Sequence, residues 1–390
     1  MASLPPSIPA THAAIAVTGL GKPIEQITVP TIPPSEGEVL IHVTHTSSSP
    51  VELHRVAGRL RVATENSEKP FILGITVGGT VVAIGPGTTT DLRVGDRVFG
   101  FVQDGSEREA AFQEYATVPA WRLGRVPDGV DMQAAVTVPG NLVTAVHTLV
   151  TDLGLPLPWP VPPATDGADD KEDEIVLVWG AASSVGMYVV QVLRHWGYRH
   201  VLAVAARKHH ETLRGLGARV CFDYREEDVA AAVAAYLDSE SNSSSNNKPG
   251  RPRVPYIVDC IGSREGTLRP LTRIAEGGSR VAVMLPVINV HASKDREAEL
   301  EMDVTKVLPG EWKDGVQLRG VRTFLYYQNE FLRSHLQSEI VPALLEQGII
   351  EPNKQRVVEG KTLLERAQKA LELLRDQAVS GEKLVWRVAE

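Results

Sequence analysis

The sequence predicts an α/β protein in which a β-rich first part precedes a doubly wound parallel sheet. Two observations predict this fold class. Strand-like runs separated by Pro- and Gly-bearing turns fill the first third of the chain. From Glu174 onward, strands alternate with apolar-periodic helices. Regular βα alternation implies a parallel sheet, because each helix carries the chain back to begin the next strand in the same direction.

The individual elements follow from these patterns. In the first part we expect strands at 13–17, 38–44, 79–84 and 111–118. In the second part we expect strands at 175–179, 201–205, 220–223, 256–260 and 280–285. The helices expected between those strands are 185–196, 209–216, 226–237 and 267–275. Three segments, 155–173, 239–253 and 290–315, have the composition of solvated surface loops.

Composition restricts the partners and the location of the protein. The formal net charge is −8, with no dense block of Lys or Arg, which argues against binding to nucleic acid or anionic lipid. No Lys or Arg precedes Lys22, and the apolar residues before it are interrupted, so no secretory signal is expected. The apolar runs are strand-sized and too short to span a bilayer. We therefore expect a cytoplasmic protein.

The two cysteines predict neither a disulfide nor a structural zinc site. Cys221 and Cys260 lie at the ends of the third and fourth strands of the predicted parallel sheet. In a sheet of order 3-2-1-4 they would be about 14 Å apart, which is too far for a disulfide. Two thiolates are also too few for a four-cysteine zinc site.

A run of small residues follows the strand 175–179 and predicts a phosphate-binding loop. Its residues are Gly180, Ala182, Ser183, Ser184, Val185 and Gly186. Small side chains let a pyrophosphate approach the backbone, and the N-terminus of the following helix offers N–H groups and partial positive charge. A βα turn that binds nothing is the alternative.

The residues that follow the second strand favour NADPH over NADH. An NAD site would place an acid about 20 residues after Gly186, to bind the ribose hydroxyls. Ala206 stands there instead, and Arg207 and Lys208 follow it, which suits a 2′-phosphate. Tyr224, past the third strand, is a further candidate for contact with the adenosine phosphate. The alternatives are a solvated helix start for Arg207 and Lys208 and simple packing for Tyr224.

Motifs distributed along nearly the whole chain resemble the medium-chain dehydrogenase/reductase superfamily. They include Ser49-Pro50-Val-Glu52, which resembles the family turn Asn-Pro-x-Asp, and Leu73 to Gly85, Val94 to Gly100, Phe112 to Val118, Val143-Thr144-Ala145, Val258 to Gly262 and Lys383-Leu384-Val385. Within the superfamily the sequence is similar to the zinc-independent fungal branch of toxD-like oxidoreductases and trans-acting enoyl reductases. The resemblance implies a GroES-like substrate domain of residues 1–140 and 340–390 and a Rossmann NADPH-binding domain of residues 141–339.

The resemblance also implies a reaction without zinc. Ser49 and Ile75 stand where the alcohol dehydrogenase branch has its Cys and His zinc ligands, so no Lewis acid is available to polarise an alcohol. His54 stands where a lysine often follows the Asn-Pro-x-Asp turn. The turn around Asp96 is expected to have a structural and not a catalytic role, and to be held by a buried interaction between Asp96 and Arg97.

The activity implied by the resemblance is NADPH-dependent reduction of an activated C=C bond in an enoyl or enone substrate, in secondary-metabolite biosynthesis. The substrate is a small molecule or is bound to a carrier, and a polyketide synthase is a candidate partner. Candidate catalytic residues are Thr144, His54 and Ser49, expected on the rim of a cleft between the domains; a helix-start hydroxyl and a solvated histidine are the alternatives for Thr144 and His54. Cys260 and Ile261 are expected beside the cofactor. A quinone or carbonyl reductase, and a dinucleotide-binding protein without turnover, are the alternative functions.

Overall fold

The chain divides into two compact units. The first comprises Met1–Val143 together with Tyr327–Glu390, and the second is the continuous stretch Thr144–Tyr326. The computed structural model describes residues 8–19, 21–58, 60, 70–161, 171, 174–226, 228–241, 250–291, 296 and 298–389. Sequence analysis placed the two divisions after residues 140 and 339.

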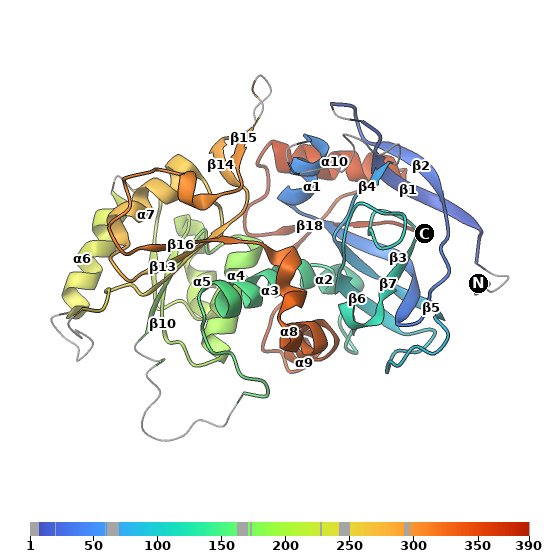
Figure 1. The fold of residues 1–390 in the computed structure, drawn as a ribbon, viewed down its shortest axis with the longest axis horizontal. Coiled ribbons are helices and arrows are strands. Elements are labelled where there is room, and N and C mark those ends of the chain that lie inside the picture. Colours follow the sequence, from blue (N-terminus) through green and yellow to red (C-terminus); the bar gives the residue numbers. More distant parts are fainter. Residues whose placement is uncertain are drawn as a thin grey trace. The chain divides into compact units, whose positions relative to one another are not determined.

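The first unit is built on a seven-stranded sheet (Figure 1). Its order is β17-β18-β3-β5-β6-β8, and β7 also pairs with β3. The bounds are β3 (Glu38–Ser48), β5 (Thr76–Ile84), β6 (Arg97–Phe101), β7 (Tyr115–Pro119), β8 (Leu123–Arg125), β17 (Gln355–Val357) and β18 (Lys383–Arg387). A smaller sheet has the order β2-β1-β4, with β1 (Thr11–Val17), β2 (Glu25–Pro30) and β4 (Phe71–Ile72). Its helices are α1 (Pro50–Val56), α2 (Met132–Ala135), α8 (Glu330–His335), α9 (Val341–Glu346) and α10 (Leu363–Arg375), and α3 (Pro139–His147) crosses into the second unit.

Trp386 on β18 anchors the core of the first unit. Its side chain is 1% exposed and meets the ring of Phe112 edge-on, with centroids 4.6 Å apart. The indole Nε1 donates to Ser48 Oγ at 2.9 Å, which satisfies the buried polar end of the ring. The last strand of the chain is thereby fixed against β3, at the end where β3 leads into Ser49.

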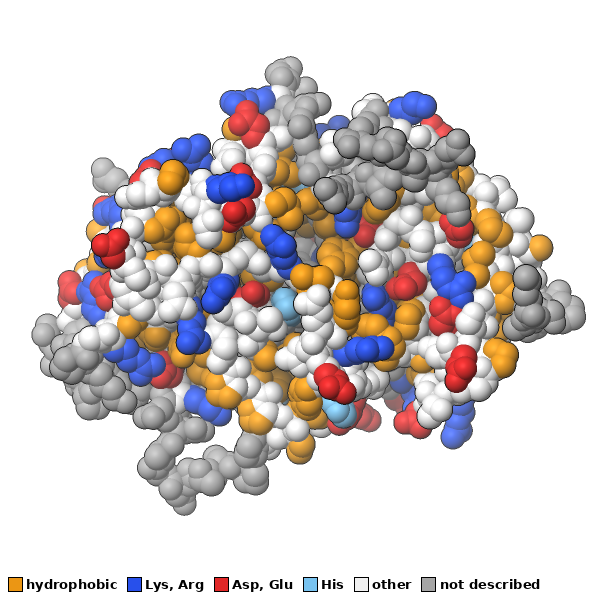
Figure 2. Space-filling model, in the orientation of Figure 1, with side chains coloured by type: hydrophobic (Ala, Val, Ile, Leu, Met, Phe, Trp, Pro, Cys, Tyr) orange, Lys and Arg blue, Asp and Glu red, His pale blue; other side chains and the backbone are white. Residues whose placement is uncertain are grey.

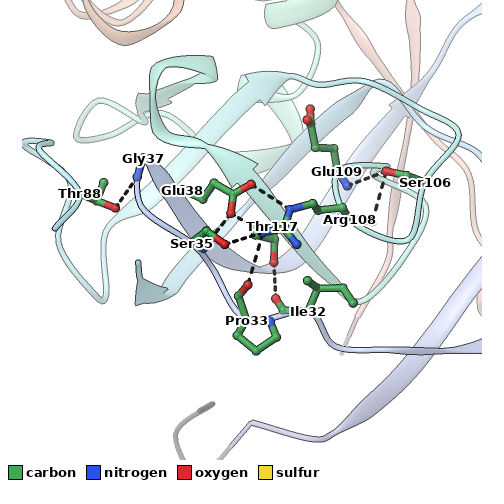
Figure 3. A network of polar contacts seen from close by, with 10 residues as sticks. All are labelled: Ile32, Pro33, Ser35, Gly37, Glu38, Thr88, Ser106, Arg108, Glu109 and Thr117. Carbon is green, nitrogen blue, oxygen red and sulfur yellow. Dashed lines mark hydrogen bonds and ion pairs between the residues drawn. The ribbon is translucent and has the colours of Figure 1, made fainter. Parts of the chain in front are cut away.

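A polar network holds the other end of β3 (Figure 3). Arg108 binds the Glu38 carboxylate with its guanidinium, Nε donating to Oε1 at 2.8 Å, and hydrogen bonds from Arg108 lower the pKa of Glu38. Thr117 on β7 donates to the carbonyl of Ile32, and Thr88 accepts from Gly37 N at 2.8 Å. These contacts tie the neighbouring loops to the start of the strand.

The predicted buried interaction between Asp96 and Arg97 is wrong. Asp96 Oδ2 accepts from the backbone N–H of Arg93 at 2.8 Å and pairs with Arg125 at 2.9 Å. Arg97 donates instead to the carbonyl of Val130 at 2.8 Å. Arg125 reaches Asp96 because β8 pairs with β6 next to this turn, and both groups of the ion pair are partly exposed.

The second unit contains the predicted doubly wound parallel sheet. Its strands are β9 (Ile175–Trp179), β10 (His200–Val204), β11 (Val220–Phe222), β12 (Tyr256–Asp259), β13 (Arg280–Met284) and β16 (Gln317–Val321). All neighbours run parallel in the order β11-β10-β9-β12-β13-β16, which is the 3-2-1-4-5-6 order of a Rossmann fold. The predicted fold class is confirmed. Cys221 and Cys260 are both free and are separated by the widths of β10 and β9.

Helices cover both faces of this sheet (Figure 1). Apolar residues of α6 (Val229–Ser241) and α7 (Arg269–Ile274) pack on one face, while α4 (Ser184–His195) and α5 (His210–Leu216) pack together on the other. The four inner strands β10, β9, β12 and β13 are therefore largely buried on both sides, which explains their mostly apolar sequences.

The segment 290–315 is not simply a solvated loop, and that prediction is wrong for the part that the structure describes. Val304, Val307 and Leu308 are buried in the core against α7 and the sheet. Before them, β14 (Val287–Val290) pairs antiparallel with β15 (Glu299–Glu301). These three apolar positions were missed because they lie among charged residues and follow neither helical nor strand periodicity. Residues 162–170, 242–249 and 292–295, within the three predicted loops, lie outside the described residues.

One helical run, Met132–Asp152, is long and apolar enough to span a bilayer by length and composition, and 72% of its most apolar window is buried inside the protein. Such burial is typical of a core helix of a soluble protein. Near its end, burial lowers the pKa of His147 to about 4.

On the face of the molecule shown in Figure 2, side chains of Lys and Arg lie among those of Asp and Glu instead of forming a single block.

Candidate functional site

The glycine-containing loop joins β9 to α4 as predicted. Gly180 has a φ of 71°, in the left-handed region that favours glycine, and its N–H donates to Val204 O on β10 at 3.0 Å. Ser183 is the N-cap of α4, and its Oγ accepts from Gly186 N at 3.0 Å. The remaining N–H groups of the first helical turn have no intrahelical acceptor. The loop thus presents a helix N-terminus at the carboxyl end of the central strand.

The two glycines are packed so closely against their neighbours that neither position could hold a side chain. A Cβ at Gly186 would lie 2.5 Å from Gly180 O, so α4 approaches the loop backbone closely. A Cβ at Gly180 would lie 2.5 Å from Ile261 Cγ1. Glycine is therefore required at both positions by the close packing of the loop, and the N–H groups at the start of α4 are of the kind that bind phosphate.

Cys260 and Ile261 lie beside this loop, at the end of β12. Cys260 N donates to Trp179 O at 2.9 Å, and burial raises the pKa of its thiol. Asp259, fully buried, accepts from Ile261 N and Gly262 N at 3.0 and 3.1 Å and from the Thr267 hydroxyl. Burial raises the pKa of Asp259 to about 6 despite these bonds. The carboxylate therefore shapes the turn that carries Ile261 toward Gly180.

The predicted 2′-phosphate residues lie at the carboxyl ends of β10 and β11. Arg207 is 76% exposed, and its guanidinium pairs with Glu226 at 2.6 Å. Its backbone N–H donates to Asp223 Oδ2 at 3.0 Å, which ties the two strand ends together. Lys208 is exposed beside Arg207.

Tyr224 completes this exposed group. It is 47% exposed, and Arg225 lies over its ring at 5.4 Å from the centroid. Sequence reasoning missed Arg225 and Glu226, because nothing in their spacing shows that they converge on Tyr224 and Arg207.

In the first unit, Ser49 lies against a buried lysine. The antiparallel register pairs Leu384 with Ser48, so the preceding residue, Lys383, falls opposite Ser49. Lys383 Nζ donates to Ser49 Oγ at 2.7 Å, although the two residues are 334 positions apart in the chain. Sequence reasoning used Lys383 only as part of a family motif. No local signal could have paired it with Ser49.

Glu52 completes this group from α1. Ser49 precedes the helix, and its backbone N–H donates to Glu52 Oε2 at 2.7 Å, as the spacing Ser-x-x-Glu of a capping box predicts. Glu52 is 0% exposed and Lys383 only 5%. Burial raises the pKa of Glu52 to about 7 and lowers that of Lys383 to about 8, and their mutual attraction opposes both shifts.

An ion pair with a buried carboxylate lies further along α1. Arg55 Nε and Nη2 donate to Asp104 Oδ2 and Oδ1 at 3.1 and 3.3 Å. Burial raises the pKa of Asp104 even with this partner. His54 lies between Glu52 and Arg55 in sequence and is half-buried. Ser49 is thus the N-cap of the short helix that carries His54.

Thr144 belongs to the second unit and is half-buried within α3. The alternative of a helix-start hydroxyl is wrong, because α3 begins five residues earlier, at Pro139. Its backbone carbonyl accepts from the Thr148 hydroxyl at 2.7 Å.

Ile75, the other residue at a zinc-ligand position of the family, is buried at 7% exposure. Among the described residues, no group of three or more His, Cys, Asp or Glu side chains could hold a metal ion.

Sequence comparison relates the chain to fungal enzymes. Residues 35–128 match the alcohol dehydrogenase GroES-like domain. The trans-enoyl reductase caaB of Aspergillus niger is 28% identical over 403 residues, with full coverage of both chains. The enoyl reductase component lovC of the lovastatin nonaketide synthase of Aspergillus terreus is 27% identical over 322 residues, which cover 81% of each chain.

Solved structures share the fold. The CurK enoyl reductase superposes with a TM-score of 0.69 at 16% identity, covering 97% of this chain and 99% of that one. A quinone oxidoreductase of Coxiella burnetii gives 0.67 at 20% identity, covering 97% and 100%. The NADPH complex of mycobacterial Rv1454c gives 0.64 at 22% identity, covering 96% and 99%. The chain thus combines a parallel sheet of order 3-2-1-4-5-6 with an alcohol dehydrogenase GroES-like segment, and it is similar over its full length to a fungal trans-enoyl reductase.

Proposed function

We propose that this protein is an NADPH-dependent, zinc-independent reductase of activated C=C bonds in enoyl or enone substrates. The observation that carries the proposal is the full-length likeness to a trans-enoyl reductase, at 28% identity over 403 residues. The preserved phosphate loop at the head of the parallel sheet supports the same reaction class. The role belongs to secondary-metabolite biosynthesis, the setting of the relative lovC.

The cofactor residues are those of the β9–α4 loop and the neighbouring strand ends. We assign the pyrophosphate to the loop, with Gly180, Ala182, Ser183, Ser184, Val185 and Gly186, and the adjoining edge to Cys260 and Ile261. When bound, NADPH supplies hydride to the β-carbon of the substrate. The chain contributes backbone N–H groups and a helix N-terminus that hold the dinucleotide in place.

Preference for NADPH is supported by the end of β10. Ala206 leaves no acid for ribose hydroxyls, while Arg207 and Lys208 expose cationic groups and Tyr224 adds an exposed ring. Arg207 reaches a phosphate by exchanging its exposed Glu226 partner, and such surface pairs contribute little. The fold neighbour Rv1454c was solved with NADPH.

Zinc independence is supported by the donors at the two ligand positions. Ile75 has no donor atom, and Ser49 Oγ already accepts from the Lys383 ammonium at 2.7 Å. A dication at Ser49 would face that buried positive charge at close range. These groups are unsuited to a metal and suited to a hydrogen-bonding role.

On the substrate side we assign Ser49, His54 and Thr144. An enolate forms when hydride reaches the β-carbon, so the protein must stabilise negative charge on the substrate oxygen and deliver a proton to the α-carbon. Hydroxyl and imidazole groups provide both functions. The substrate is a small molecule or is attached to a carrier, a polyketide synthase is the proposed partner, and the location is cytoplasmic.

The test is a substrate panel assayed by NADPH oxidation. Enoyl thioesters and enones should be reduced, with mass spectrometry showing two added hydrogens at the C=C bond. Turnover of quinones or aldehydes alone would favour the second candidate, a quinone or carbonyl reductase, which the likeness to the Coxiella burnetii quinone oxidoreductase supports. NADPH binding with no turnover of any class would instead indicate a dinucleotide-binding protein.

A further inference from the structure

The direction of hydrogen bonding between Lys383 and Ser49 leaves the serine proton available. An ammonium group only donates, so Ser49 Oγ is the acceptor of their 2.7 Å bond. The Ser49 hydroxyl hydrogen must then point to another acceptor. Ser49 is half-buried whereas Lys383 is 5% exposed. The serine hydroxyl therefore gives the buried ammonium a route to a ligand.

Glu52 is placed to keep this lysine charged. One carboxylate oxygen, Oε2, accepts from Ser49 N, while Oε1 is buried with no hydrogen-bond partner in the described part of the chain. The charged form of Glu52 attracts Lys383 and raises the pKa of the lysine, against the larger opposite effect of burial. Burying a lysine costs free energy, because its ammonium group loses water. A lysine that is kept buried with its ammonium hydrogen-bonded to a serine hydroxyl points to a chemical role.

The other charges near this group are already paired. On α1, Arg55 is engaged by Asp104, which comes from the segment after β6. Immediately before Lys383 in the chain, Glu382 pairs with Arg356 of β17. His54 lies on α1 as well, and the charge that acts on Lys383 is that of Glu52.

We propose that Ser49 and Lys383 form the proton-donating pair of the reductase, with Ser49 as the catalytic residue in contact with substrate. Lys383 acts through Ser49, and Glu52 positions and charges Lys383. This inference rests on the proposed enoyl reduction. As the enolate collapses, the Ser49 O–H bond breaks and a new C–H bond forms at the α-carbon. The Lys383 ammonium passes one proton to Ser49 Oγ, and the neutral amine regains a proton from water.

The first test replaces the serine and uses its neighbour as the control. Ser49→Ala should lower kcat for an enoyl thioester by about 100-fold, within the range of general acid catalysis, and leave NADPH affinity unchanged. The control is Ser47→Ala, since Ser47 Oγ is buried with no hydrogen-bond partner among the described residues. Wild-type kcat in Ser49→Ala would overturn the proposal.

The second test uses the pH profile, because a structural lysine would not alter it. A donor must be protonated, so kcat of the wild type should fall as pH rises through the pKa of Lys383, and this alkaline limb should disappear without Lys383. Lys383→Met leaves Glu52 buried without a cation and can fail to fold. The double variant Lys383→Met/Glu52→Gln removes both charges, and Lys369→Met, on the surface of α10, is the matched control.

The outcomes separate this inference from the proposed function. A double variant with a lowered kcat that no longer falls at alkaline pH supports the proton-donating pair. If kcat of the folded double variant falls with pH as in the wild type, the proposed pair is overturned. If only His54→Ala abolishes this fall, the proton comes from His54. Wild-type protein that reduces no enoyl or enone substrate would refute the proposed function itself. Wild-type turnover combined with fully active variants would refute only the pair.

Discussion

The exposed ion pair between Arg207 and Glu226 allows NADPH preference to be tested with two substitutions of opposite effect. Arg207→Ala removes a charge-assisted hydrogen bond to the 2′-phosphate, worth about 1.5–3 kcal/mol. It also removes the 2.6 Å pair with Glu226, which competes for the same guanidinium and is worth about 0.2–1 kcal/mol. The net loss is therefore about 0.5–2.8 kcal/mol, or about 2- to 100-fold in the Kd for NADPH.

Glu226→Gln should act in the reverse direction. Without the competing carboxylate, Arg207 is free to bind the phosphate, and the Kd for NADPH should fall by about 1.5- to 5-fold. The Kd for NADH should change little in either variant, because NADH lacks the 2′-phosphate. Calorimetric titration of both dinucleotides at one fixed salt concentration measures all six constants.

Two results would refute this reasoning. Equal loss of NADPH and NADH affinity in Arg207→Ala would mean that Arg207 supports the loop and does not contact the phosphate. Weaker NADPH binding in Glu226→Gln would mean that the ion pair organises the site instead of competing with it. Added salt should also weaken the wild-type preference, since both charges are exposed.

Three further predictions concern the metal, the substrate and stability. Dialysis against a strong chelator should leave both turnover and Tm unchanged, whereas stoichiometric zinc whose removal abolishes activity would contradict zinc independence. Thr144→Val should lower kcat by about tenfold with little change in the Kd of NADPH, as measured by steady-state kinetics and titration; wild-type kcat would remove Thr144 from the site. In the folded protein the pKa of His147 is about 4, below the unfolded value of 6.5. As pH falls through this range the unfolded chain binds the proton first, so the free energy of unfolding should decrease by on the order of 3 kcal/mol. Urea unfolding of His147→Leu across the same range should show a much smaller loss, and an equal loss would assign the effect to other groups.

The second unit was predicted well because its elements are set by local patterns. The run 175–179 was identified at its observed bounds, and β11, β12 and β13 deviate by one residue at one end. The strand β10 is shifted by one residue at both ends, and β16 was not predicted. Prediction was poorer in the first unit, where β7 begins at Tyr115 instead of residue 111, and β17 and β18 were not predicted as strands at all. Those strands depend on long-range pairing, because β18 becomes a strand by pairing with β3.

The candidate site shows the same division between local and distant information. The phosphate loop is contiguous in sequence, so its residues could be identified together, including the serine that caps α4. The Ser-x-x-Glu spacing likewise predicts that Ser49 and Glu52 meet across one helical turn. Lys383 joins them through sheet register, and Glu226 meets Arg207 across neighbouring strand ends. Such contacts have no signature in a single sequence.

The position of β18 also bears on how the protein is made. The second unit is one continuous stretch and can fold as soon as it leaves the ribosome, whereas the first unit must wait for a strand encoded after it. Until β18 arrives, that side of β3 is an unpaired sheet edge and Trp386 is missing from the core. The period of synthesis between these two events is therefore when the nascent chain is most prone to aggregate and most dependent on chaperones.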